Sequence, residues 1–304
     1  MPVTAEDIAA YLDAHDDFDL ELFVHRSLLM SGFRSEQAGT YSDPTTGRPQ
    51  RFDVRARRFF PGGRRQVLLA VECQSLSVEC PLLVSRVPRS VQEGYHEVIR
   101  SWQAQETGED AVEVLRWERG LELYPENVQV GRKLARLPND AGTDGESPQE
   151  QWSRAVMSAA DLVREANRAS GERGALDCYT LVLPVMVVSD GALWAMDYTE
   201  SGQRARAALQ VQETEIYLGR EYELRPGYLY RISHLHLFTR EGFSRFLAKL
   251  AEPASGLLEQ MFQFTTLREK ARPADRTSAR SRGRLRGGEG TPGADLAPAS
   301  SKSS

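Results

Sequence analysis

Apolar and polar residues alternate along Arg51–Phe60, with Asp53 in the middle of the polar set. Such alternation predicts a strand with one buried and one polar face. The next segment, Gln66–Gln74, contains a continuous apolar run, which predicts a strand buried on both faces. Short turns rich in Gly, Pro and Asp separate these segments from each other and from Ser35–Tyr41. We therefore expect an antiparallel meander of three strands.

Segments with helical spacing flank this meander. Asp19–Ser31 carries apolar residues at a helical period, and Gly32 follows where a C-cap would stand. Further helices are expected at Thr4–His15, Val91–Gln105, Gln149–Ser170, Arg240–Leu250 and Leu257–Leu267. Further strands are expected at Cys178–Val188 and Ala192–Tyr198, paired across a turn, and at Val211–Tyr217 and Leu229–Leu237. The pattern predicts an α/β protein with a central mixed sheet flanked by helices.

The chain has 304 residues, of which 40% are hydrophobic, enough for one large domain with a real core. We expect a single domain over residues 1–268, with its core at about 18–105 and 175–250 and a flexible loop at about 138–149. Residues 271–304 hold almost no large apolar side chains but several Arg, which predicts a disordered basic tail. Such a tail either adds non-specific affinity for phosphates or is simply solvated.

The net charge of -5 argues against a general nucleic-acid coat, so any such binding would need a local basic patch. Three cysteines without a CxxC spacing argue against a disulfide framework or a cysteine zinc site. The acidic N-terminal segment lacks the apolar stretch of a signal peptide, and no apolar run is long enough for a membrane span. These features predict a cytoplasmic protein without a membrane partner. They do not define its oligomeric state or a protein partner.

Asp53 and Glu72 are the candidate chemical groups. Glu72 ends the apolar run of its strand, where a charged carboxylate is costly unless it is paired, solvated or bound to a metal. Adjacent antiparallel strands would bring it close to Asp53. Two carboxylates, the backbone carbonyl of Cys73 and waters would suit Mg²⁺ or Mn²⁺, which prefer oxygen ligands. A metal held there could activate a water molecule.

The stretch from Tyr41 to Ser75 reads YSDPTTGRPQRFDVRARRFFPGGRRQVLLAVECQS. It resembles the PD-(D/E)XK restriction-endonuclease-like nucleases, in which a helix with an acid precedes a hairpin, a strand with Asp, a strand ending in Glu-x-Lys and a helix. The resemblance covers about residues 18–105 well and about 175–250 loosely. It implies a restriction-endonuclease-like core and a metal-dependent endonuclease. The substrate it implies is DNA in preference to RNA, with a role in restriction or defence.

By this resemblance Asp53 and Glu72 would bind the metal. Glu21, on the preceding helix, would be the third acid, with Glu36 as a competing candidate. Gln74 stands where the family usually has Lys. Glutamine can orient a water but lacks the charge that would stabilise a developing anion. An alternative is therefore a catalytically degenerate module that binds nucleic acid or a protein without cleavage. A third possibility is an unrelated α+β protein in which the carboxylates are structural.

Two other groups of residues bear on function. Seven arginines crowd the predicted hairpin and would either cradle phosphates or keep an exposed face soluble: Arg48, Arg51, Arg55, Arg57, Arg58, Arg64 and Arg65. His234 and His236 share one face of a strand, a geometry that can bind zinc, but no third ligand is evident nearby. A structural pair is the favoured interpretation, and a helix-surface role is favoured for His25.

Overall fold

The computed structural model describes residues 3–9, 17–103, 107, 110–117, 124–125, 128–137, 148–168, 177–225, 228–252 and 256–262. All of them belong to residues 1–263, which form one compact unit. The predicted loop lies outside the described residues up to position 147, as does the predicted tail at 271–304. No helix in the described part of the chain has the length and hydropathy needed to cross a bilayer.

The chain forms helices and strands in an interleaved order. The helices are α2 (Phe18–Met30), α3 (Pro148–Arg168), α4 (Arg240–Ala251) and α5 (Leu257–Met261), with a 3₁₀ turn at Val91–Glu93. The first seven strands are β1 (Arg34–Ser42), β2 (Pro49–Phe59), β3 (Arg65–Gln74), β4 (Leu82–Pro88), β5 (His96–Gln103), β6 (Asp110–Trp117) and β7 (Gln129–Arg136). The others are β8 (Cys178–Val188), β9 (Leu193–Asp197), β10 (Leu209–Gln210), β11 (Glu213–Arg225) and β12 (Tyr228–Thr239).

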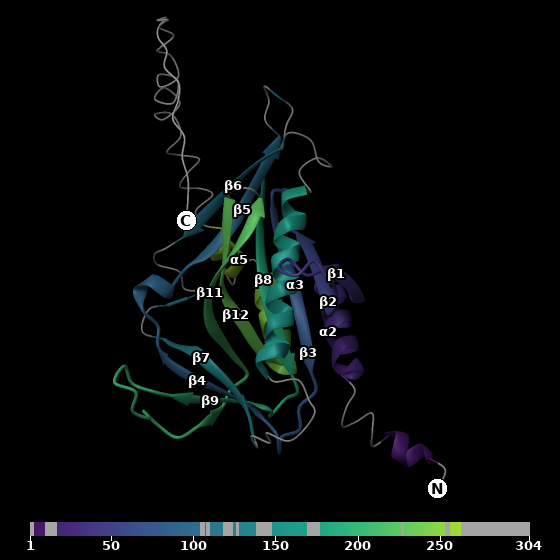
Figure 1. Ribbon diagram of the computed structural model, residues 1–304, viewed down its shortest axis with the longest axis vertical. Coiled ribbons are helices and arrows are strands. Elements are labelled where there is room, and N and C mark those ends of the chain that lie inside the picture. Colours follow the sequence, from purple (N-terminus) through teal and green to yellow (C-terminus); the bar gives the residue numbers. More distant parts are fainter. Residues whose placement is uncertain are drawn as a thin grey trace, which may run out of the picture. The chain divides into compact units, whose positions relative to one another are not determined.

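The strands form one mixed sheet in the order β1-β2-β3-β8-β12-β11-β7-β4-β9-β10, with β5 added to β8 and β6 added to β5. Strands β1, β2 and β3 are antiparallel, whereas β3 and β12 both run parallel to β8. In Figure 1, β3, β8 and β12 run along the vertical, and β4, β7 and β9 cross their direction at the lower left. The predicted α/β class with a mixed sheet is confirmed.

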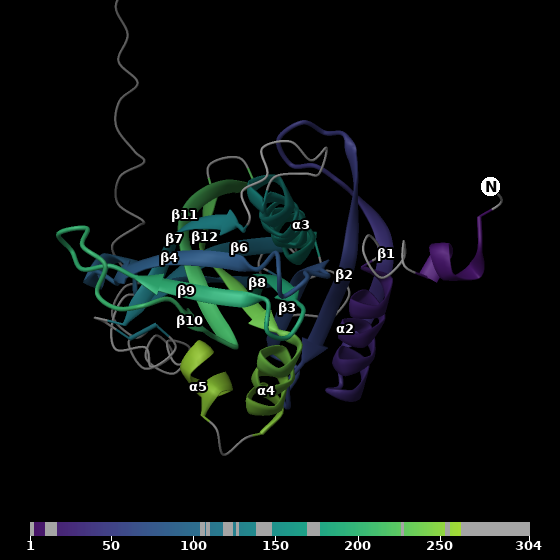
Figure 2. The same cartoon turned by 90° about the horizontal axis from the view of Figure 1, so that it is seen from below.

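Helices cover both faces of the central strands. Figure 2 shows α3 on one side of β3 and β8, with α2 and α4 on the other. Strand β3 is buried over nearly its whole length, as its apolar run predicts. Because β3 and β8 are parallel, the chain must cross over between them, and α3 is the helix of that crossover. Its buried face is rich in alanine, which allows close packing on the sheet: Ala155, Ala159, Ala160 and Ala166.

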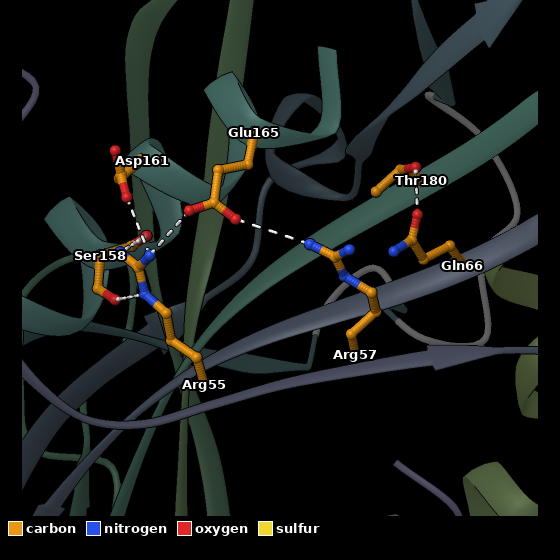
Figure 3. Close-up of polar contacts among 7 residues, drawn as sticks. All are labelled: Arg55, Arg57, Gln66, Ser158, Asp161, Glu165 and Thr180. Atoms are coloured by element: carbon orange, nitrogen blue, oxygen red, sulfur yellow. Dashed lines mark hydrogen bonds and ion pairs between the residues drawn. The ribbon is translucent and has the colours of Figure 1, made fainter. Parts of the chain in front are cut away.

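A polar stripe on α3 sets the register of the helix on β2. The stripe consists of Arg154, Ser158, Asp161 and Glu165, spaced three or four residues apart and therefore on one helix face. Arg55 of β2 donates to Ser158 Oγ at 3.0 Å and to Asp161 Oδ2 at 2.9 Å (Figure 3). Arg57, two residues further along β2 and on the same face, pairs with Glu165 at 3.6 Å. The negative charges of the stripe thus face the positive charges of β2.

The predicted pairing of the strands at Cys178–Val188 and Ala192–Tyr198 is wrong. Both segments are extended, but β9 pairs with β4 and β10 rather than with β8. Strand β8 already has β3 along one edge and β12 along the other, with β5 at its beginning. No free edge is left for β9, so the chain carries it to β4 instead.

The predicted helix at Val91–Gln105 is also wrong. Among the residues described in this range, Val91–Glu93 alone is helical, and His96–Gln103 is strand β5, which pairs with β6 and with the start of β8. These long-range pairings outweigh the local propensity, which β-branched Val98 and Ile99 already weaken. Strands β4, β6 and β7 were not predicted. Helix α5 begins at Leu257 as expected, and residues beyond 262 lie outside the described range.

Replacing Arg55 by Met should lower the free energy of unfolding by about 2–4 kcal/mol, because Ser158 and Asp161 would lose a buried charged partner. Arg57→Met is the matched control on the same strand face. Its pair with Glu165 is far more exposed, so we expect a loss under about 1 kcal/mol. Urea denaturation of the two variants measures the difference. Equal losses would show that Arg55 does not anchor α3.

Candidate functional site

Asp53 and Glu72 face each other across β2 and β3. The last pair of the ladder is Val54 with Val71, and continuing it by one residue (54 − 1 and 71 + 1) places Asp53 opposite Glu72. Residues directly opposite in an antiparallel pair project to the same face of the sheet. By period two this is also the face of Arg55, which α3 covers. The structure thus brings together the two carboxyls that the sequence singled out.

The β2–β3 ladder ends at this point, and beyond it the side chain of Asp53 accepts a hydrogen bond from the backbone of β3. The backbone N–H of Cys73 donates to Oδ2 of Asp53 at 2.8 Å. On the other edge of β2, the β1–β2 register places Ala38 opposite Asp53. Ala38 has a φ of 56° and is the non-glycine residue with positive φ among those described. Such a backbone costs on the order of 1 kcal/mol, and strain of this kind is often concentrated at functional sites.

Burial and neighbouring charges perturb both carboxyls. Burial raises the pKa of Asp53 to about 6, although the hydrogen bond from Cys73 acts in the opposite direction. Glu72 is only 2% exposed. Burial, together with the charge of Asp53 and a hydrogen bond with its carboxyl, raises the pKa of Glu72 to about 9. The two groups therefore tend to share a proton at neutral pH, as close carboxyl pairs do.

Two further acids lie near this pair. Glu21 of α2 accepts from Gln37 Nε2 at 3.1 Å, and its charge raises the pKa of Asp53. Asp17, immediately before α2, accepts from the backbone N–H of Ser75 at 2.5 Å. Its charge also raises the pKa of Asp53, and burial raises its own pKa.

Glu36 does not belong to this group. It is exposed on β1, and its charge is not among the causes that shift the pKa of Asp53 or Glu72. Of the two candidates for a third acid, Glu21 acts electrostatically on Asp53, and Glu36 is not among the causes given for either carboxyl.

Arg154 is the cation of the site. Its Nη2 lies 2.5 Å from Oε1 of Glu72. Its charge lowers the pKa of Asp17, Asp53 and Glu72 alike. It belongs to the polar stripe of α3, two helical steps before Asp161, so the contacts of Arg55 also hold Arg154 over Glu72.

Gln74 and Cys73 occupy the end of β3. Gln74 lies two residues beyond Glu72 on the same strand face and is 5% exposed. Cys73 points to the opposite face, is buried, and pairs with Val187 in the β3–β8 ladder. Burial, followed by the surrounding carboxylates, raises the pKa of its thiol well above the ordinary value, so it is not a thiolate nucleophile.

Several of the hairpin arginines contact protein groups. Arg55 and Arg57 bind α3, Arg58 lies over the Phe60 ring at 4.7 Å, and Arg65 pairs with Glu259 at 2.5 Å. The exposed arginines of this set are Arg48, Arg51 and Arg64. A phosphate cradle built from all seven arginines is therefore excluded.

The predicted structural role of the two strand histidines agrees with their surroundings. His234 stacks on the Tyr124 ring at 4.1 Å, and His236 Nε2 lies 3.1 Å from the Tyr124 hydroxyl. Burial, followed by the charge of Arg89, lowers the pKa of both imidazoles. They are thus neutral members of a buried aromatic cluster. His25 shares a 2.9 Å hydrogen bond with Ser35 instead of reaching the carboxyl pair.

The donor chemistry of the Asp53–Glu72 pair fits a small hard cation, because repulsion between the two carboxyls would be relieved by a shared positive ion. In the part of the chain that the structure describes, no group of three or more His, Cys, Asp or Glu is arranged to hold a metal. Mg²⁺ commonly uses only one or two carboxylates, with water and substrate phosphate completing its shell.

No protein-family model, curated protein or solved structure matches the chain.

Sequence patterns did not reveal Asp17 or Arg154. Asp17 stands where a helix N-cap is expected, yet its side chain does not cap α2 and instead binds the end of β3. Arg154 looks like an ordinary helix-surface charge. The spacing of Arg154, Ser158, Asp161 and Glu165 was the available signal, because it marks a continuous polar face on a helix that must also pack on the sheet.

The raised pKa of Glu72 predicts a pH-dependent stability. In the folded state the pKa of the Glu72 carboxyl is raised to about 9, whereas an unfolded chain releases this proton near the ordinary glutamate pKa of 4.5. The free energy of unfolding should therefore fall as pH rises through this window. Glu72→Gln cannot ionise, so its stability relative to wild type should increase by a few kcal/mol, to order of magnitude, between these limits. Parallel curves for wild type and Glu72→Gln in denaturation at several pH values would contradict this, and exposed Glu36→Gln is the control.

Proposed function

We propose that this protein is a metal-dependent phosphodiesterase of the endonuclease type that acts on DNA. The observation that carries the proposal is the Asp53–Glu72 pair at the end of β3, where a half-buried and a buried carboxyl with raised pKa values meet beside Arg154. Burial of such groups without function would be costly. Asp53 and Glu72 would hold Mg²⁺ or Mn²⁺, with the charge of Glu21 acting on Asp53.

The chain order supports the resemblance to the PD-(D/E)XK nucleases. Helix α2 carries Glu21, the meander β1-β2-β3 follows with Asp53 and Glu72 on its last two strands, and α3 then leads to β8. Helix α2 and the meander follow the order on which the resemblance rests. The helix expected next, at Val91–Gln105, is replaced by strand β5, and α3 comes only later in the chain. Strands β4 to β7 are an insertion between β3 and α3 in this arrangement.

The reaction would be hydrolysis of a phosphodiester bond. A water oxygen forms the new bond to phosphorus, the bond from phosphorus to the leaving sugar oxygen breaks, and that oxygen takes a proton from solvent. A bound Mg²⁺ would lower the pKa of a water and draw charge from the phosphate. With a pKa of about 6, Asp53 is largely ionised at pH 8, so it can orient the water and pass its proton to solvent.

A binding module without cleavage is the second candidate. Gln74 favours it, because a neutral side chain stands where the resembled family has lysine. The use of Arg55 and Arg57 to hold α3 also leaves fewer cations for a substrate. DNA binding with no cleavage under any divalent metal would establish this function instead.

Incubation with supercoiled plasmid and Mg²⁺ or Mn²⁺ at pH 8 tests the proposal. Wild type should nick or linearise the plasmid, and Asp53→Asn should lose at least about a hundredfold in rate, because the amide can still accept from Cys73 but carries no charge. Glu36→Gln is the matched control and should cleave like wild type. Cleavage that is equal in wild type and Asp53→Asn, or absent from both, would refute the nuclease function, and RNA in place of plasmid tests the other substrate.

Metal binding can be measured without cleavage. Mn²⁺ should raise the melting temperature at pH 8, because a ligand that binds only the folded state stabilises it. The rise should be smaller at pH 6, where protons compete for Asp53 and Glu72. Differential scanning fluorimetry of wild type and Asp53→Asn provides the comparison. A shift that survives in Asp53→Asn would place the metal elsewhere.

A further inference from the structure

We propose that Arg154, on the crossover helix α3, is the phosphate-binding cation of the site and supplies the positive charge that Gln74 does not. This inference rests on the proposed function. It assigns to Arg154 a direct contact with a non-bridging oxygen of the substrate phosphate, where the guanidinium stabilises the negative charge that builds up during hydrolysis.

The exposure of the two partners supports this role. The side chain of Arg154 is 39% exposed, whereas that of Glu72 is 3% exposed. The side chain of Arg154 is therefore the more exposed of the two partners, although its Nε is buried. An anionic substrate approaching the carboxyls would meet the positive charge of Arg154, and a guanidinium has several N–H donors, so it can keep Glu72 while it binds a phosphate oxygen.

The packing of α3 limits how far Arg154 can move. The Arg55 contacts with Ser158 and Asp161 hold the helix one turn away from Arg154. A charge preorganised in this way needs little rearrangement when substrate binds.

The side chain of Gln74 gives the complementary observation. It lies on the same face of β3 as Glu72 and is buried. A lysine there would add a second, nearly buried cation to a site that already holds Arg154. We expect the site to use a single positive charge. A lysine at position 74 should therefore compensate for the loss of Arg154, but Gln74→Lys alone should bring no gain in cleavage rate.

A charge exchange tests this assignment by plasmid cleavage. Arg154→Gln should lower the cleavage rate about a hundredfold, the usual effect of removing one transition-state donor. Arg154→Lys should retain most of the rate, and the double variant Arg154→Gln with Gln74→Lys should recover at least about tenfold over Arg154→Gln. Arg245→Gln, which removes a helix-surface Arg–Glu pair on α4, is the matched control and should cleave like wild type. Wild-type cleavage by Arg154→Gln would overturn the assignment while leaving the nuclease function standing.

A second measurement separates this assignment from cleavage itself. Binding of a labelled DNA duplex in EDTA, followed by fluorescence anisotropy, should weaken about tenfold in Arg154→Gln, the effect of one charge-assisted contact, and be unchanged in Arg245→Gln. If wild type does not cleave, the nuclease proposal fails, and this binding result alone decides the role of Arg154. Equal affinity of wild type and Arg154→Gln in EDTA would overturn it.

Discussion

The charge complementarity between α3 and β2 is the constraint on which the candidate site depends. Parallel strands β3 and β8 require a crossover, and an apolar helix face alone would leave the position of that crossover loosely defined, because hydrophobic contact has no direction. The contacts of Arg55 with Ser158 and Asp161 have direction and fixed length. They fix the register of α3, and the register in turn brings Arg154 to Glu72.

Several energetically unfavourable features lie together at the end of β3, and the stability of the rest of the fold compensates for them. Burial and repulsion raise the pKa values of Asp53 and Glu72. Ala38, opposite Asp53 on the neighbouring strand β1, has a positive φ. Arg154 offsets only part of this repulsion, because it is a single cation among several carboxyls. A bound cation would relieve the repulsion between the carboxyls, and this is the reason for proposing a metal-dependent function.

Local pattern was sufficient for the elements nearest the site. The alternation in β2, the apolar run of β3 and the helical periods of α2 and α3 all predicted what the structure shows. Prediction from local pattern failed where strand pairing depends on which edges of the sheet are free. Strand β5 was expected as a helix, and β9 was expected beside β8. Both depend on which strand edges remain open after the centre of the sheet is built, and no local window contains that information.

By itself, the sequence determined the order of the central elements and the three positions Asp53, Glu72 and Gln74, because these lie on neighbouring strands joined by a short turn. Only the tertiary structure decided that Asp17 and Arg154 join them. Those two residues come from the start of α2 and from the crossover helix, and their positions follow from how helices pack on a finished sheet. The charge balance of the site, with Arg154 beside the acids and a neutral Gln74, is therefore a property of the fold rather than of the motif.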